Sequence, residues 1–409
     1  MNAASPLLPV AEALARVLAS APQPLAAQTV ALADARGRTL AQDLAALRTQ
    51  PPFNASAMDG YALRAADLAT IPARLKLIGE SAAGHRFPGA VGPGEAVRIF
   101  TGAPVPPGAD TVVIQENTQA DSAGVNILQA EAMGRNIRPA GLDFAEGDPL
   151  LARGLRLGPC ELALAAAMNH GSVPVTRRPR IALLATGDEL VKPGDALGPD
   201  QIVTSNTYAI GAYAEAAGAE VIDLGIAGDT FAAIEAGIRA AREAGADVLV
   251  TLGGASVGDH DLVQTALANE GMELGFWKIA MRPGKPLMHG RIGDMRILGL
   301  PGNPVSAIVC GVLFLIPLIR ALTGDPRAGA DSSEAALLGC DLPANDSRQD
   351  YLRATLQPGE SLPVATPFGR QDSSMLRVLA RSHCLVVRPP HAPAAKAGDP
   401  CRVIRLAAF

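Results

Sequence analysis

The pattern of apolar and polar positions changes style several times along the chain. Residues 6–20 place apolar side chains at helical spacing, which predicts an amphipathic helix, and a second short helix is predicted over 34–44. From about residue 50 to 143, short alternating runs are broken by Gly and Pro, a pattern typical of small β domains. Residues 145–177 return to the helical style. We therefore expect the β segment to be inserted into a helical platform.

Residues 179–320 alternate apolar β-branched runs with helical patterns. Strands are expected at RIALLAT, VIDLGIAG, DVLVTLGG and MRILGL, and a helix is expected after each of them. This alternation is typical of a parallel sheet with helices on both faces. The longest apolar run, from Val305 to Ile319, is shorter than a membrane span and follows a helix-start signal at Asn303. It predicts a buried helix, not a membrane segment.

The remaining chain reads as a small β domain, with strands expected at YLRATL, CLVVRP and CRVIRL. The predicted fold class is therefore multidomain α/β plus β, with a central, doubly wound, parallel α/β domain. The expected domains are a helical or mixed platform over 1–48 and 144–177, an inserted β domain over 49–143, the α/β domain over 178–326, and a β-barrel-like domain over 327–409.

Composition narrows the function classes. The chain has 409 residues, a net charge of -5 and only 3% aromatic residues, which argues against a nucleic-acid-binding protein. Five scattered cysteines support neither a zinc site nor a disulfide framework. Their odd number and the lack of a signal-peptide pattern predict a cytoplasmic protein.

Glycines follow the strand DVLVTLGG in the segment VLVTLGGASVG. Glycines at the carboxyl end of a buried strand let backbone amides approach an anion closely, although many such turns hold no ligand. The carboxyl edge of an open α/β sheet is where such folds bind ligands. We therefore take this turn as a candidate anion site, formed by Gly253, Gly254, Ser256 and Gly258.

Acidic residues follow other predicted strands. Asp188 and Glu189 in ATGDEL suit a hard cation such as Mg²⁺, but first-turn acids of a helix explain them equally well. Asp229 and Asp261 also follow strand ends, so several carboxylates are expected on one edge. Without a metal or a cationic neighbour they would repel one another.

Basic residues are concentrated in WKIAMRPGKP. Arg282 and Lys285 flank a Pro-Gly turn, with Lys278 just before, and such a group can hold a tetrahedral oxyanion; a solvated basic turn is the alternative. The motif LPGNPVSA joins a strand to a helix. Its helix N-terminus suits anions, but simple capping by Asn303 explains most of it.

Two motifs lie in the β segment. Asp59 in FNASAMDGYAL is either an exposed functional carboxylate or an Asx-turn residue that caps its own backbone. Thr101 in IFTGAPVPPG offers a hydroxyl and a backbone amide that could hold an anion, and an ordinary β-turn is the alternative. Taken together with the α/β turns, these loops predict a polyanion site with carboxylates for a metal.

The ordered set of motifs resembles the molybdopterin molybdenumtransferase family, called MoeA in bacteria and similar to the E domain of gephyrin. The segments that carry the resemblance span nearly the whole chain and are SAMDGYA, TGAPVP, GRNIRPAGLD, ATGDEL, GGASVGDHD, RPGKP and LPGNPVSA. The resemblance implies a four-domain, L-shaped homodimer whose α/β domain has the molybdopterin-binding fold. It also implies insertion of molybdenum from molybdate into adenylylated molybdopterin, with Mg²⁺-assisted release of AMP.

The resemblance assigns roles by matching position. Asp59 and Thr101 would be catalytic residues that reach the partner subunit's cleft, and Arg282 stands where many members carry Lys. Arg353 and Ser373 would contact the oxyanion, with Arg348 and Ser374 as competing alignments. The implied catalytic set is Asp59, Thr101, Glu189, Asp229 and Asp261, and the implied Mg²⁺ ligands are Asp188, Glu189 and Asp261. The implied substrate-binding set is Arg138, Gly253, Gly254, Ser256, Gly258, Lys278, Arg282, Lys285, Pro286, Pro301, Gly302, Asn303, Arg353 and Ser373.

Two other functions remain open on the sequence. One is a molybdopterin adenylyltransferase, whose relatives share the α/β domain but lack the SAMDGYA and TGAPVP segments. The other is a non-catalytic scaffold like gephyrin. The resemblance also implies a partner adenylyltransferase and molybdoenzymes as recipients of the product.

Overall fold

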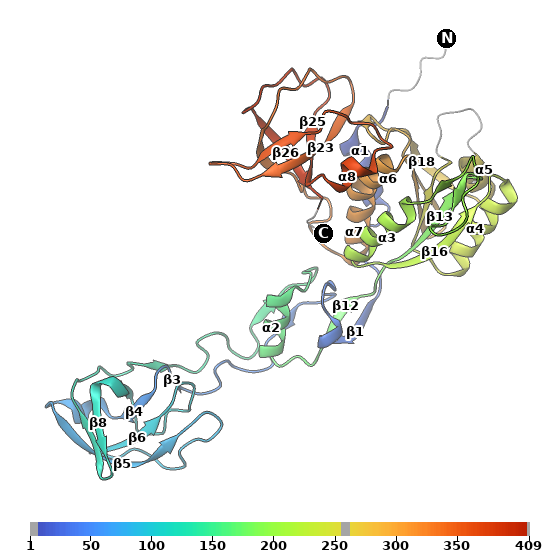
Figure 1. Ribbon diagram of the computed structural model, residues 1–409. Coiled ribbons are helices and arrows are strands. Elements are labelled where there is room, and N and C mark those ends of the chain that lie inside the picture. The colour runs from blue at the N-terminus through green and yellow to red at the C-terminus, as the bar shows by residue number, and fades with distance from the viewer. Residues whose placement is uncertain (1–6, 255–261, 407–409) are drawn as a thin grey trace.

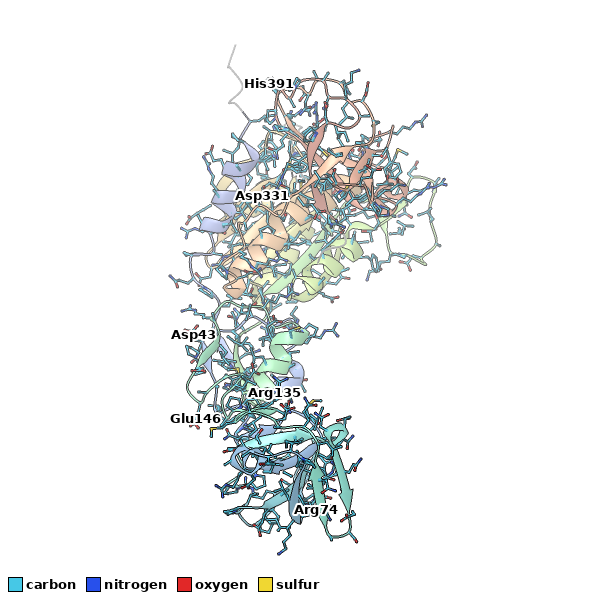
Figure 2. All side chains as sticks on the ribbon, turned by 90° about the vertical axis from the view of Figure 1, so that its left-hand side faces the viewer. Asp43, Arg74, Arg135, Glu146, Asp331 and His391 are labelled. Carbon is cyan, nitrogen blue, oxygen red and sulfur yellow. The ribbon has the colours of Figure 1, made fainter. Side chains whose placement is uncertain are left out.

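The chain is elongated in the computed structural model, which describes residues 7–254 and 262–406 (Figure 1). The sheet that contains β4 and β6 lies at one end, and the α/β sheet and the last β domain lie at the other. Strands β1 and β12 and helix α2 lie between them. Figure 2, turned by 90°, shows the same separation, with Arg74 at one end and His391 at the other.

The predicted first helix is confirmed as α1, Val10–Ala19. We expected it in the platform, but its apolar stripe of Val10, Ala13 and Val17 is buried in the core of the α/β domain. The predicted helix over 34–44 is wrong. Only a 3-10 turn, Leu32–Asp34, forms, since Gly37 has a φ of 70° and the backbone of Leu40 then pairs with that of Val175.

The platform is mixed rather than purely helical. Strand β1 (Ala27–Ala31) pairs antiparallel with β12 (Ser172–Thr176), and β2 (Leu44–Ala45) pairs with β11 (Pro149–Leu151). The predicted helix near Gly171 is confirmed as α2, Pro159–Ala167. Its small core holds Leu40, Leu157, Met168, Val173 and Val175.

The inserted segment is all β, as predicted. Six strands form one sheet in the order β7-β4-β6-β5-β9-β8, and a short pair, β3 with β10, lies beside them. The turn between β3 and β4 carries Asp59, and Thr101 lies two residues after the end of β6. The strands are β3 Ala55–Ser56, β4 Gly60–Leu63, β5 Ala73–Ser81, β6 Glu95–Ile99, β7 Thr111–Ile114, β8 Thr118–Asp121, β9 Gly124–Ile127 and β10 Ile137–Arg138.

The α/β sheet has the order β16-β13-β17-β21-β20-β18, and its first four strands are parallel, as predicted. Strands β20 and β18 extend it antiparallel and were not predicted, because MHGRI and ELGFW lack a continuous apolar run. The strands are β13 Arg180–Thr186, β16 Glu220–Ala227, β17 Val248–Leu252, β18 Glu273–Trp277, β20 Met288–Ile292 and β21 Met295–Leu300.

Helices cover both faces of this sheet. Ile181 and Leu183 of β13 pack into one core with α1, α3 and the last helix, whereas Ala182 and Leu184 pack into the other core with α4 and α5. This alternation of side chains is what a doubly wound strand requires, because successive residues point to opposite faces. The helices are α3 Asn206–Ala216, α4 Phe231–Glu243 and α5 Leu262–Asn269.

The predicted buried helix is confirmed. It comprises α6 (Pro304–Cys310), a π-helical turn (Gly311–Leu315) and α7 (Ile316–Thr323). Its 20 residues are apolar and long enough to cross a membrane, but 78% of the most apolar window is buried inside the protein. It is therefore the core helix of the α/β domain.

The last domain is a closed barrel. Strand β23 pairs with both β24 and β25, so the order β23-β24-β22-β26-β25 returns to β23. The predicted strands YLRATL, CLVVRP and CRVIRL correspond to β23, β25 and β26. The strands are β22 Glu334–Leu338, β23 Gln349–Gln357, β24 Val364–Pro367, β25 Cys384–Arg388 and β26 Pro400–Arg405; β19 (Met281–Arg282) adds to β23, and helix α8 is Leu376–Ala380.

Candidate functional site

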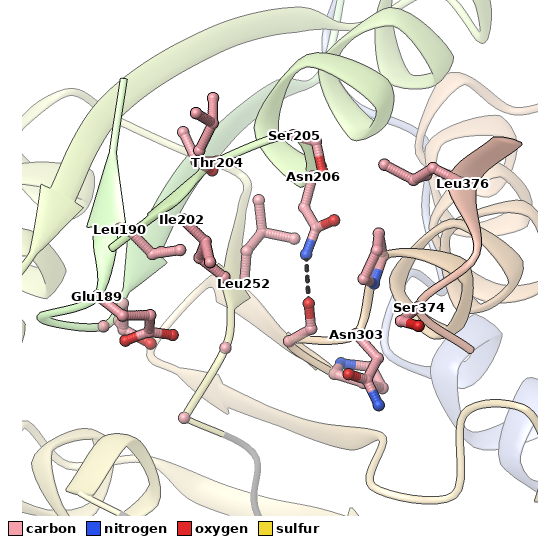
Figure 3. A pocket seen from close by; sticks show the side chains of 18 of the residues that line it. Glu189, Leu190, Ile202, Thr204, Ser205, Asn206, Leu252, Asn303, Ser374 and Leu376 are labelled. Atoms are coloured by element: carbon pink, nitrogen blue, oxygen red, sulfur yellow. Dashed lines mark hydrogen bonds between the residues drawn. The ribbon is translucent and has the colours of Figure 1, made fainter. Parts of the chain in front are cut away.

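A cavity of about 810 Å³ lies at the carboxyl edge of the α/β sheet (Figure 3). Its floor is formed where β13, β17 and β21 end, at Thr186, Leu252 and Pro301. This is the edge that the strand order predicts for a ligand site. One wall comes from β14 (Leu190–Val191) and β15 (Ile202–Val203), and the opposite side comes from Ser374 and Leu376 of the C-terminal segment.

Two predicted glycines are required by the geometry of the floor. Gly253 has a φ of 110°, and a Cβ there would lie 2.6 Å from the carbonyl oxygen of Thr186. Gly254 has a φ of 64°, and its Cβ would lie 2.1 Å from Val263. Since only glycine fits at either position, the backbone itself lines this part of the cavity. The buried hydroxyl of Thr186 has no hydrogen-bond partner among the described residues.

Carboxylates lie on the opposite part of the rim. Glu189 and Asp229 line the cavity, and Asp188 accepts a hydrogen bond from the Asp229 amide at 3.0 Å. Asp188 and Glu189 lie in the turn between β13 and β14, and α3 begins only at Asn206, so the alternative of first-turn helix acids is wrong. Gly187 has a φ of 147°, and a Cβ there would lie 2.4 Å from Glu189 Oε2. Gly187 therefore makes room for the Glu189 carboxylate.

The carboxylates are of the ligand type that the predicted Mg²⁺ prefers. Glu189 and Asp229 offer oxygen ligands on one cavity, and Mg²⁺ is commonly held by one or two carboxylates together with substrate phosphates. Within residues 7–254 and 262–406, no group of three or more His, Cys, Asp or Glu side chains could hold a metal by itself. Asp261 lies outside the described residues, as do Ser256 and Gly258.

Two helices begin at the cavity. Helix α3 begins at Asn206, and the long core helix begins at Pro304. The predicted simple capping by Asn303 is wrong: its side chain caps nothing, and its Nδ2 donates to Ser373 Oγ at 3.0 Å. Ser205 likewise makes no side-chain cap. Both N-termini thus bring backbone N–H groups and a positive dipole end to the cavity, which suits an anion.

Asn206 lines the cavity, although the sequence analysis did not single it out. Its Nδ2 donates to the carbonyl oxygen of Gly302 at 2.8 Å (Figure 3). The Oδ1 atom is buried and has no hydrogen-bond partner among the described residues. Two-residue strands such as β14 and β15 have no periodic pattern, so the wall they form was also missed.

The C-terminal segment closes one side of the cavity. Ser374 lines it, whereas Ser373 holds Asn303 and its carbonyl accepts from the Val305 amide at 3.0 Å. Arg353 is only 1% exposed and lies behind this segment. Its guanidinium donates to Gln371 Oε1 at 2.9 Å and to the Asp372 carbonyl at 2.6 Å. Arg353 therefore holds the segment that carries both serines.

The predicted basic group is divided in the structure. Arg282 makes two hydrogen bonds to Asp350 and a salt bridge of 3.3 Å to Asp346, both from the last domain. The hydrogen bonds that Arg282 donates to Asp350 raise the pKa of Arg282 above its ordinary value. Lys278 Nζ lies 3.7 Å from the centroid of the Trp277 ring. Arg282 thus joins two domains, and of this segment only Pro286 lines the cavity.

Asp59, Thr101 and Arg138 lie in the inserted β domain, whose main sheet is at the opposite end of the molecule from the α/β sheet (Figure 1). Asp59 does not cap its own turn. Its Oδ1 accepts from both the amide and the hydroxyl of Thr101, and these bonds lower the pKa of the carboxyl. The Thr101 amide, which we expected to hold an external anion, holds this carboxylate. Arg138 is exposed on β10.

Comparisons with known proteins cover the chain nearly end to end. Residues 8–169 match the MoeA N-terminal region (domains I and II), residues 182–321 match a probable molybdopterin binding domain, and residues 335–406 match the MoeA C-terminal region (domain IV). A molybdopterin molybdenumtransferase from Haemophilus influenzae is 34% identical over 93% of this chain and 94% of its own length. The corresponding protein from Bacillus subtilis is 36% identical over 93% of this chain and 90% of its own length.

The chain belongs to the MoeA family. Two solved structures of MoeA proteins from Pyrococcus horikoshii agree, with TM-scores of 0.82 and 0.83 at 29% and 25% identity. They cover 99% and 97% of this chain and 100% and 99% of their own. The predicted resemblance, the fold class and the assignment to a family of transferases are thereby confirmed.

Proposed function

We propose that this MoeA-family chain inserts molybdenum from molybdate into adenylylated molybdopterin and releases AMP with the assistance of Mg²⁺. Family membership supports molybdopterin molybdenumtransferase activity in molybdenum cofactor biosynthesis. One observation carries the finer proposal: Glu189 and Asp229 share a single large cavity with the Gly253-Gly254 backbone and two helix N-termini. That combination suits a phosphate anhydride together with a divalent cation.

The substrate's phosphates would lie against the floor. Only backbone lines the cavity at Gly253 and Gly254, so amides can approach phosphate oxygens that a side chain would keep away. The starts of α3 and of the core helix add N–H donors from other directions. The cavity volume of about 810 Å³ is in the range for a nucleotide-sized ligand.

Glu189 and Asp229 would hold Mg²⁺, with Asp261 as a further candidate ligand and Asp188 positioning Asp229 through its amide. When bound, the cation would stabilise negative charge that develops at the scissile phosphate. The Glu189 carboxylate can lie at the rim because Gly187 has no Cβ, which would otherwise collide with it. The chain supplies no nucleophile in this scheme, so an oxygen of water or molybdate attacks phosphorus.

Molybdate would bind on the side formed by the C-terminal segment. Ser374 lines that side. Because Arg282 is held by Asp350, Lys278 and Lys285 would be the cations of this segment that offset the charge of the two polyanions. Arg353 would act through the segment that it holds, at Gln371 and Asp372. An oxyanion next to an anhydride needs such positive charge to approach.

A second copy of the chain would complete the site. Asp59 and Thr101 lie at the far end of their own chain, yet they form a hydrogen-bonded, exposed pair suited to contact a ligand. We therefore propose a homodimer in which the inserted domain of one copy reaches the cavity of the other. A partner adenylyltransferase and recipient molybdoenzymes, in the cytoplasm, belong to the same proposal.

The proposal is tested by incubating purified protein with adenylylated molybdopterin, molybdate and Mg²⁺ and measuring AMP. We expect release of AMP that depends on all three additions. Formation of adenylylated molybdopterin from ATP, with no AMP release from the adenylate, would instead indicate an adenylyltransferase. The N-terminal match over residues 8–169 argues against that outcome. A lack of both activities in folded protein would leave the scaffold function and overturn the proposal.

A further inference from the structure

A second cavity, of about 370 Å³, lies at the opposite end of the α/β sheet. Strand β13 begins there at Arg180 and ends at Thr186 beside the first cavity, so the two sites are about 20 Å apart along the strand. The lining of the second cavity comes from β1 of the platform and from the starts of β13 and β16. Its lining residues are Gln28, Arg177, Arg178, Arg180, Glu220 and Gly245.

Two carboxylates of the described residues lie near this cavity; one is fully hydrogen-bonded, and the other forms only a long, exposed ion pair. Asp247 accepts two hydrogen bonds from Arg177, at 2.7 and 2.6 Å, and a third from the Arg180 amide at 2.8 Å. Glu220 Oε2 lies 3.7 Å from Arg180 Nε, and both side chains are about half exposed. An exposed pair at that distance is weak, so Arg180 keeps most of its capacity to bind another anion.

Arg178 has no ion pair among the described residues. It lies in the short connection between β12 and β13, with Arg177 on one side and Pro179 on the other. Its guanidinium therefore adds a positive charge to the cavity that no carboxylate of the described chain neutralises.

More arginines are packed close to Arg178. Arg38 is 7% exposed and donates to the Thr176 carbonyl at 2.9 Å. Burial lowers the pKa of Arg38, and the charge of Arg178 lowers it further. Arg156 has its pKa lowered in the same way, first by burial and then by Arg320, against an opposing effect of Asp325. The junction between the two domains therefore carries an excess of positive charge.

We propose that this junction cavity binds a small multivalent oxyanion of the phosphate or pyrophosphate type, with Arg178 and Arg180 as its direct contacts. Two guanidinium groups can each bind a tetrahedral oxyanion through paired N–H donors, and arginine suits this geometry better than lysine. The cavity volume is enough for a pyrophosphate-sized ligand. Because the lining comes from β1 as well as from β13 and β16, a bound anion would lie between the platform and the α/β domain.

The test measures the reactivity of Arg178 in the full-length protein. Phenylglyoxal modifies accessible arginines, and the modified positions are mapped by mass spectrometry with and without inorganic pyrophosphate. We expect pyrophosphate to slow modification of Arg178 at least about fivefold, since charged hydrogen bonds to an anion are strong. Modification of Arg178 at the same rate with and without pyrophosphate, at concentrations up to the millimolar range, would overturn the proposal.

Calorimetric titration with pyrophosphate gives an independent measure. The variant R178Q/R180Q is compared with R239Q/R242Q, which removes the same charge from α4 of the same domain. We expect the junction variant to lose the binding event at the junction, or at least about tenfold of its affinity, and the α4 variant to keep this binding event unchanged. Identical isotherms for the two variants would contradict the proposal. The phenylglyoxal assay is repeated with AMP to identify the class of anion. If AMP protects Arg178 at lower concentrations than pyrophosphate does, the site takes a nucleotide phosphate. If pyrophosphate protects at lower concentrations than AMP does, the site takes an inorganic anion.

Discussion

Thr101 donates two hydrogen bonds to one carboxylate oxygen of Asp59, from its amide at 2.7 Å and from its hydroxyl at 2.8 Å. The pair joins two motifs that are 42 residues apart in the sequence. Both donors stabilise the ionised carboxylate, so the pKa of Asp59 is lowered below its ordinary value of 3.8, first by the amide and then by the hydroxyl. Asp59 is therefore held in one orientation as an anion at neutral pH.

Removing the hydroxyl alone tests this relationship. In T101V the hydrogen bond from the backbone amide of residue 101 to Asp59 remains. We expect the pKa of Asp59, measured by carboxyl ¹³C NMR, to rise towards 3.8. A carboxyl group whose pKa is lowered in the folded protein stabilises the fold at pH values above its ordinary pKa, and this stabilisation is lost as the pH falls through the pKa of the folded state. In T101V we expect the loss to begin at a higher pH. Activity at pH 7 should fall in both T101V and D59N without a change in secondary structure. An unchanged pKa in T101V would refute the role of the hydroxyl.

Arg98 is a positioning residue for the same turn. Its guanidinium lies 5.1 Å from the Tyr61 ring centroid and 4.8 Å from the Phe100 ring centroid, and it donates to Gln115 Oε1 at 2.7 Å. R98K keeps the charge but loses the planar group that stacks between the rings. We expect kcat to fall several-fold with KM nearly unchanged.

Arg74 provides the control for Arg98. It forms an exposed salt bridge of 2.6 Å with Asp121 in the same β domain, a type of pair that contributes little. R74K should therefore leave both kcat and the free energy of unfolding within error. Equal losses in R74K and R98K would show that Arg98 has no special role.

Gly187 controls the place of Glu189. In G187A the new Cβ would lie 2.4 Å from Glu189 Oε2, so the carboxylate must leave its present position. We expect activity to fall at least about tenfold, because a small misplacement of a reacting group is costly. G194A is the matched control, since Gly194 also has a positive φ, of 94°, but has open space around it. Comparable activities of the two variants would contradict this reading.

Variants of Asn303 and Thr230 distinguish a residue that caps a helix from one that acts in the site. The Thr230 side chain accepts from the Ala233 amide at 3.2 Å and caps α4, so T230A should lower the free energy of unfolding by about 0.5–2 kcal/mol. Asn303 caps nothing, so N303A should cost less stability but reduce activity, because it releases Ser373. Denaturant unfolding and AMP release measure the two effects. A larger loss of stability in N303A than in T230A would refute the distinction.

Much of the fold could be predicted because the spacing of apolar residues and the length of an apolar run can be read from the local sequence. The four parallel strands and the buried helix from Pro304 each have a continuous apolar pattern. The predicted helix over 34–44 failed because its backbone pairs with residues near 155 and 175, contacts that no local pattern reports. Strands β18 and β20 were missed for the same reason, since each gains its place only by pairing in the sheet.

The site was predicted in part. Gly253, Gly254, Glu189 and Asp229 do line one cavity, since they follow parallel strands whose ends meet at one edge. Arg282 was expected to face an oxyanion, but Asp350 lies 68 residues later and binds it across a domain boundary. Such pairings between distant segments, like that of Thr101 with Asp59, depend on the folded chain.

The central claim is that a carboxylate from one chain completes the cavity of another, and mixed dimers test it most directly. D59N and E189Q, each of which we expect to be inactive by itself, are mixed, allowed to exchange subunits and assayed for AMP release. If sites form between chains, half of the dimers are mixed and each has one intact site, so about a quarter of wild-type activity returns. Activity that stays at the level of the separate variants, while subunit exchange is confirmed by mass, would contradict the account.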